Sequence, residues 1–146
     1  CLDWWYLRTS SGLQLYYHTK TKDYWIAEAV GMEIAAGAIF ALIWLTQTDK
    51  ITAVSPNKLW RSAAIGFTYV STLYWSINRT GGSNNPTYGL LQTFIALWKT
   101  GLSIEMQYTW LYVVCPFVGA ALAWPVFELI FKPAHKVSID VEANKV

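Results

Sequence analysis

The stretch Gly81-Gly82-Ser83-Asn84-Asn85-Pro86-Thr87-Tyr88-Gly89-Leu90 is the most informative part of the sequence and lies between two long apolar runs. Adjacent glycines and asparagines permit positive φ and tight turns. Asn85 suits the N-cap position of a helix, and Pro86 suits the first helical position, where a missing N–H costs nothing. The apolar residues from Leu90 to Trp98 then predict a helix too short to cross a bilayer, which suggests a half-helix folded back into a membrane protein.

The composition indicates an integral, multi-pass membrane protein in contact with a lipid bilayer. Hydrophobic residues make up 54% of the 146 residues and charged residues 14%, whereas soluble domains contain about 25% charged residues. The nine Trp and nine Tyr residues are of the kind that gathers at bilayer interfaces. The net charge of +2 forms no basic stripe and gives no reason to expect a nucleic acid partner.

Three segments have the length and apolarity of spanning helices: 25–45, 59–77 and 108–131. The length of each segment is close to that of a helix that crosses the hydrocarbon core, which is about 20 residues. Ser55-Pro56-Asn57 is a helix-start signal before the second segment, and Lys132-Pro133 is predicted to end the third. We therefore expect an all-α membrane protein with three transmembrane helices and one re-entrant half-helix. The predicted organisation is 1–24 as an interfacial loop or the end of a truncated helix, 25–133 as the membrane unit, and 134–146 as a polar tail.

Glu33 lies deep in the first predicted span. A carboxylate in hydrocarbon costs about 2.5–3.5 kcal/mol, so Glu33 must face protein or water and needs a partner. The 11 Lys and Arg residues divide almost evenly between the two sides of the membrane, which leaves the orientation open.

The order of these features resembles the C-terminal half of the aquaporin (major intrinsic protein) family over residues 25–133. Besides Glu33 and the approach to Asn85-Pro86, the resemblance includes Trp110 and the run Pro116-Phe117-Val118-Gly119-Ala120-Ala121-Leu122-Ala123. Members of the family contain two inverted repeats, whose half-helices meet at their N-termini in mid-membrane. The partial positive charges of these two ends oppose cations and protons.

The resemblance assigns roles to particular residues. Asn85 would donate a hydrogen bond to passing water or solute, Pro86 would be the first helical residue, and Thr87 replaces the usual Ala. Glu33 matches a buried carboxylate that braces the loop before the half-helix. Its alternative role is that of a proton-carrying carboxylate.

Three departures weaken the interpretation as a selective channel. Tyr88 stands where the family's selectivity filter has Arg, Leu73 stands where water-selective members have His, and Gly82 brings no side chain to another filter position. In addition, only one repeat is present. Because the chain begins with Cys1 and not Met, we expect it to be a piece of a longer chain, with the first half in missing sequence, in another chain, or absent.

Asn85 and Tyr88 each allow two interpretations. Asn85 is either a pore-lining donor or only the N-cap of a buried half-helix, and Tyr88 is either an altered filter residue or an aromatic that packs or plugs. We expect a degenerate, non-conducting aquaporin-like protein that acts as a structural or accessory subunit of a larger membrane complex. The alternative is a passive channel for water or small neutral solutes, completed by a missing N-terminal half. Nothing in the sequence suggests a catalytic residue, a metal site or a cofactor, so we do not expect an enzyme.

Overall fold

The structure is a computed structural model that describes residues 22–100 and 108–143. Its elements are α2 (Lys22–Thr48), α3 (Lys58–Thr80), α4 (Pro86–Thr100), α5 (Thr109–Val126), the π-helix η2 (Phe127–Phe131) and α6 (Lys132–Ala143). The described residues are thus helical apart from their connections, which confirms the predicted all-α class. Residues 1–21 of the predicted interfacial segment lie outside the described part.

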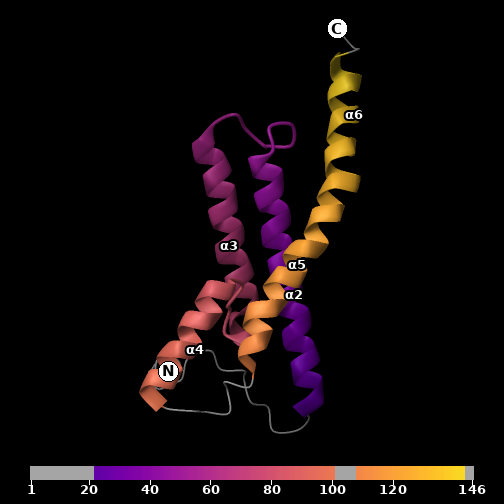
Figure 1. Ribbon diagram of the computed structural model, residues 1–146. Helices are drawn as coiled ribbons and strands as arrows, with labels where there is room; N and C mark the ends of the chain where they lie inside the picture. Colours follow the sequence, from indigo (N-terminus) through magenta and orange to yellow (C-terminus); the bar gives the residue numbers. More distant parts are fainter. Residues whose placement is uncertain (1–21, 101–107, 144–146) are drawn as a thin grey trace.

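The helices form a bundle around α2. In Figure 1, α3 runs beside α2, α5 crosses α2, and α6 continues beyond α5 toward the C-terminus. The short helix α4 begins about halfway along α2, close to the end of α3, and leads away from the bundle. The half-helix therefore starts at mid-depth of the bundle, as a re-entrant segment should.

The backbones of α2 and α5 touch where both helices carry glycine. A Cβ atom on Gly37 would lie only 2.8 Å from the Cα of Pro116. On the facing helix, a Cβ atom on Gly119 would lie 2.7 Å from the backbone nitrogen of Ala38 and would clash with the carbonyl oxygen of Ile34. Because lipid tails provide no hydrophobic drive for helix association, such close backbone packing is a main source of attraction between helices in a membrane.

Two helical stretches, Ile26–Thr48 and Thr109–Ile139, are long and apolar enough to cross a membrane. The second predicted span, which corresponds to α3, has 23 residues but does not meet the same criterion, because it carries many hydroxyl side chains. Three of these hydroxyls face inward: Thr72, Ser76 and Thr80 are buried, whereas Phe67 and Tyr74 are exposed. A helix with an apolar outer face and a polar inner face is compatible with lipid contact. The mean hydropathy of such a helix is low, so a criterion based on the mean does not identify it as a membrane span.

The buried hydroxyls of α3 are paired with the helix backbone. Thr72 Oγ1 donates to the carbonyl oxygen of Thr68 at 3.0 Å, and Ser76 Oγ donates to that of Thr72, also at 3.0 Å. Their burial therefore leaves no unpaired donor, and the polar face of α3 can lie inside the protein at little cost.

The prediction that Lys132-Pro133 ends the last helix is wrong. The chain continues through η2 into α6 as far as Ala143, so the described part of the predicted polar tail is helical. In η2 the backbone N–H of Lys132 bonds to the carbonyl oxygen of Phe127, five residues earlier. This wider turn comes directly before Pro133, whose missing N–H and ring would otherwise disrupt an α-helical turn.

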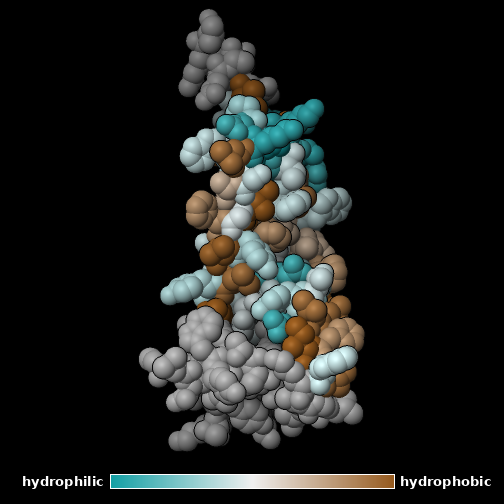
Figure 2. All heavy atoms as spheres, turned by 90° about the vertical axis from the view of Figure 1, so that its left-hand side faces the viewer, coloured by the Kyte–Doolittle hydropathy of each residue, from teal (hydrophilic) through white to brown (hydrophobic). Residues whose placement is uncertain are grey.

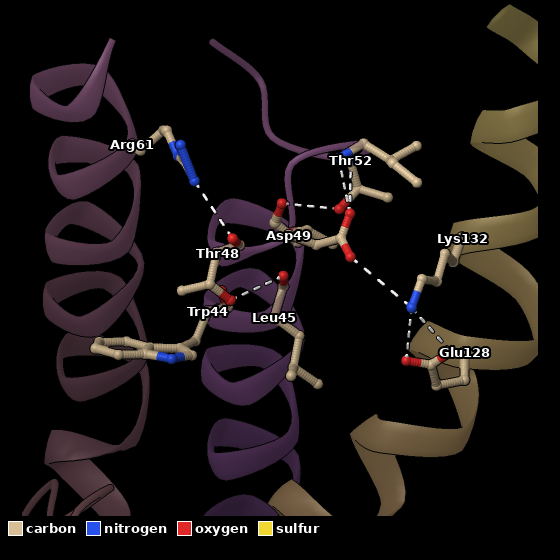
Figure 3. Close-up of polar contacts among 10 residues, drawn as sticks. Trp44, Leu45, Thr48, Asp49, Thr52, Arg61, Glu128 and Lys132 are labelled. Atoms are coloured by element: carbon tan, nitrogen blue, oxygen red, sulfur yellow. Dashed lines mark hydrogen bonds and ion pairs between the residues drawn. The ribbon is translucent and has the colours of Figure 1, made fainter. Parts of the chain in front are cut away.

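A polar cluster joins three helices at the end of α2 (Figure 3). Arg61 of α3 donates from Nε to the carbonyl oxygen of Gln47 at 2.7 Å and from Nη2 to that of Thr48 at 3.4 Å, which satisfies backbone groups at the C-terminus of α2. Asn57 caps the start of α3 by accepting from the N–H of Leu59 at 2.9 Å, so the predicted helix start is confirmed.

On the other side of this cluster, Lys132 links α6 to the connection after α2. Its Nζ lies 3.1 Å from Oε1 of Glu128 and 3.8 Å from Oδ2 of Asp49. A hydrogen bond from the Ile51 N–H to Asp49 lowers the pKa of this carboxyl below its usual value. Asp49 therefore stays ionised at neutral pH, and the stability it contributes is lost only as the pH falls through this lowered pKa.

The glycine crossing gives a direct test of the packing. We expect Gly119→Ala to lower the free energy of unfolding by about 1–3 kcal/mol, because backbone atoms of α2 would have to move. Gly66→Ala on α3 is the matched control, since a Cβ there meets nothing within 4 Å. Thermal unfolding in detergent micelles measures both variants, and equal losses would contradict the close crossing.

Candidate functional site

The segment between α3 and α4 turns through three left-handed residues. Gly81 has φ 83°, Gly82 has φ 70° and Asn84 has φ 46°. Such values favour glycine and are tolerated by asparagine, which explains the residue types at these positions. Gly82 also lies against α3, because a Cβ there would be 3.0 Å from the carbonyl oxygen of Leu73. The segment therefore doubles back beside α3 and starts α4 next to it.

The side chain of Glu33, on α2, is fully buried and hydrogen-bonds to this segment. Its Oε1 accepts from Oγ1 of Thr80 at 2.5 Å, and its Oε2 accepts from the backbone N–H of Asn84 at 3.0 Å. The Thr80 hydroxyl in turn accepts from the N–H of Gly82 at 3.3 Å. One carboxylate thus connects α2, the last residue of α3 and the turn, through bonds of the stronger, charge-assisted kind.

A second buried contact comes from α5. The Tyr112 hydroxyl donates to the carbonyl oxygen of Thr80 at 2.9 Å. A Cβ on Gly89 of α4 would lie 2.7 Å from the Cβ of Tyr112, so glycine is required where α4 packs on this residue. Neither Tyr112 nor Thr80 was predicted as a site residue from the sequence. A tyrosine in an apolar span was a usable signal, because a buried phenol normally has a hydrogen-bond partner.

Asn84 was also missed. Its side chain is almost completely buried, and its Nδ2 donates to Oγ1 of Thr72 at 2.5 Å. Its Oδ1 has no hydrogen-bond partner in the described part of the chain. The pairing of Asn84 with Thr72 joins the turn to the middle of α3, and no spacing in the sequence indicated it.

α4 begins at Pro86, and Asn85 caps it. Oδ1 of Asn85 accepts from the N–H of Thr87 at 2.9 Å, and its carbonyl oxygen accepts from the N–H of Gly89 at 3.0 Å. Asn85 is only partly buried, and the structure records no hydrogen bond from its Nδ2 to any described residue. The start of α4 therefore offers one amide donor beside the partial positive charge of a helix N-terminus.

Leu73, Gly82 and Tyr88, which the resemblance equates with filter positions, lie around this helix start. The structure places Gly82 against Leu73, as described above, while Tyr88 is on the first turn of α4 with 39% of its surface exposed. These residues supply no cation. Within residues 22–100 and 108–143, no group of His, Cys, Asp and Glu residues could hold a metal ion. Chemically, the site can donate and accept hydrogen bonds at mid-depth of the bundle.

The role of Glu33 can be tested by removal. We expect Glu33→Ala to lower the free energy of unfolding by about 1–3 kcal/mol, because the Thr80 hydroxyl and the Asn84 N–H lose their acceptor while buried. Hydrogen exchange at Asn84 should become faster. The control is Glu128→Ala, which removes a partly exposed pair and should cost less than about 1 kcal/mol. Unchanged stability and exchange in the Glu33 variant would contradict a bracing role.

Comparison with known proteins identifies the family of the chain. The sequence model described as major intrinsic protein matches residues 3–127. Aquaporin SIP1-1 of Zea mays is 26% identical over 100 residues, which cover 68% of this chain and 39% of that protein. The chain thus spans about two fifths of the relative that it matches, and no solved structure matches it. With the matched region covering most of its length, the chain belongs to the major intrinsic protein family and is an aquaporin-like integral membrane protein.

Proposed function

We propose that this protein is a non-conducting aquaporin-like element that serves as a structural or accessory subunit of a larger membrane complex. The observation that carries the proposal is Tyr88, which stands on the first turn of α4 where the family resemblance implies a filter Arg. A phenol provides neither the fixed positive charge nor the multiple donors of a guanidinium. Gly82, at another filter position, adds no side chain to replace them.

The hydrogen bonds of the loop support the same proposal. Glu33, Thr80 and the Asn84 side chain use their polar groups to connect helices and turn. Asn85 and Pro86 fulfil the ordinary requirements of a helix start. Each retained residue of the motif therefore has a structural reason to be present, and its retention does not by itself indicate conduction.

The partners that we propose are the lipid bilayer and other membrane subunits or an N-terminal half. We do not propose an enzymatic role, because the hydroxyl that meets a carboxylate in the described site, Thr80 beside Glu33, is fully buried. Aquaporin SIP1-1 is named as an aquaporin, but the match covers 39% of that protein.

One observation favours a second candidate, a passive channel for water or small neutral solutes completed by an N-terminal half. The Nδ2 of Asn85 is not bonded to any described residue, so this donor is free to bind a passing molecule. Under this alternative, Tyr88 would be an altered filter residue and not a block.

Osmotic shrinkage distinguishes the two candidates. We expect proteoliposomes that contain the complete protein to shrink after osmotic shock at the rate of empty liposomes, because the Tyr88 ring stands where the filter residue would contact the solute. Liposomes with a conducting aquaporin provide the positive control. If liposomes with this protein shrink faster than empty liposomes, the non-conducting proposal is wrong and the channel is supported.

The part played by Tyr88 is tested in the same assay. We expect Tyr88→Arg to raise the shrinkage rate above the background, since it replaces the ring with the missing cation. Tyr88→Phe keeps the ring and should stay at background. If the Arg variant also stays there, the loss of conduction does not originate at Tyr88.

A further inference from the structure

The end of the bundle at which α2 and α3 are connected carries an excess of positive charge. Residues 49–61 and 128–136, which lie at this end, include five Lys and Arg residues but only two Asp and Glu residues. Both of these carboxylates lie beside one cation, Lys132. The structure records no ion pair between the other four cations and any residue whose side chain it describes. These four are Lys50, Lys58, Arg61 and Lys136.

Two exposed tryptophans place this end at the surface of the membrane. Trp44 lies one turn before the end of α2 and Trp60 lies in the first turn of α3, and such rings prefer the level of the lipid headgroups. Figure 2 shows hydrophilic side chains gathered at this end, with hydrophobic side chains below it. Because a helix rises about 1.5 Å per residue, Lys58 and Arg61 lie at nearly the same depth as Trp60. The cations are therefore at the level of the lipid phosphates.

Arg61 is oriented at this level by α2. Its Nε donates to the carbonyl oxygen of Gln47 at 2.7 Å and its Nη2 to that of Thr48 at 3.4 Å. Figure 3 shows the guanidinium extending from α3 toward the end of α2, above the ring of Trp44. These bonds use two of the five N–H groups of a guanidinium, and the structure records no bond of the others to a described residue. An oriented guanidinium with N–H groups to spare is well suited to the oxygens of a phosphate.

We propose that this end of the bundle binds the headgroup of an anionic phospholipid, with Arg61 contacting the phosphate and Lys50 and Lys58 adding positive charge around it. The chain is an integral membrane protein, so a lipid headgroup is available at this depth. A zwitterionic lipid carries an ammonium group that the two lysines repel, whereas an anionic lipid carries none or balances it with a further negative charge. The charge excess thus selects the class of lipid.

The lipid preference of the full protein in phosphatidylcholine liposomes tests the site. We expect spin-labelled phosphatidylglycerol to associate with the protein about fivefold more strongly than spin-labelled phosphatidylcholine, and Lys50→Gln/Lys58→Gln to remove most of this preference. Added salt should lower the preference, because these side chains are exposed. The control is Lys99→Gln, near the end of α4 that lies farthest from this site in Figure 1. Equal association of the two lipids, or an equal loss in the control, would overturn the proposal.

The contact of Arg61 with the phosphate is tested separately from its bonds to α2. Arg61→Lys keeps the positive charge but loses the planar fork of donors, so the lipid preference should fall to an intermediate value. Circular dichroism and thermal unfolding of the same variant report on the structural role. A folded variant with the full lipid preference would refute Arg61 as the phosphate contact.

A soluble phosphate distinguishes a lipid site from a general anion site. Glycerol phosphate carries the same phosphate without acyl chains, and we expect it not to displace spin-labelled phosphatidylglycerol at equal concentration. Displacement would show that the site takes free phosphates and would overturn the lipid as its occupant. Both candidate functions place this end against lipid, so the osmotic assay and the lipid assay fail independently of each other.

Discussion

The arrangement of this protein depends on one buried carboxylate. Glu33 has no exposed surface, and it accepts from the Thr80 hydroxyl and the Asn84 N–H. Because an ionised group in a membrane interior is tolerated only with such partners, the carboxylate and the turn require each other. The turn fixes where α4 starts, and Tyr112 adds a contact from α5 to the same residue, Thr80. Three helices therefore determine the position of a short fourth one.

The polar face of α3 is likewise tolerated inside the protein because its buried groups have hydrogen-bond partners. Buried hydroxyls at Thr72, Ser76 and Thr80 point into the bundle, while the outer face is aromatic and aliphatic. A soluble helix has the reverse distribution, so a search for apolar length detects α2 and α5 but not α3. The cost of burying the hydroxyls is small because each donates within the helix or to Glu33. The Asn-Pro start of α4 is part of this structural network, and a channel and a structural subunit would share that network. That distinction lies at Tyr88 and at the exposed start of α4.

Much of the fold and part of the site could be predicted from the sequence because the decisive signals are local. The apolar lengths of α2 and α5, the helix start at Asn57 and the Asn85-Pro86 start of α4 depend on neighbouring residues only. The end of the last helix could not be predicted in this way: the π-helical turn of η2 accommodates Pro133, and a proline in sequence shows only its usual effect. Tyr112 and the Asn84–Thr72 pair were missed because their partners lie 32 and 12 residues away.

The sequence by itself determined the class of protein, the approximate number of helices and the need of Glu33 for a partner, because composition, apolar length and the cost of a buried charge can be read without coordinates. Only the tertiary structure decided which groups supply that partner and that the backbones of α2 and α5 touch at Gly37 and Gly119. It also showed that the Asn85 Nδ2 is bonded to no residue of the described part of the chain. The physical reason is that hydrogen bonds and backbone contacts depend on atoms a few ångströms apart, and those atoms come together only when helices distant in sequence pack.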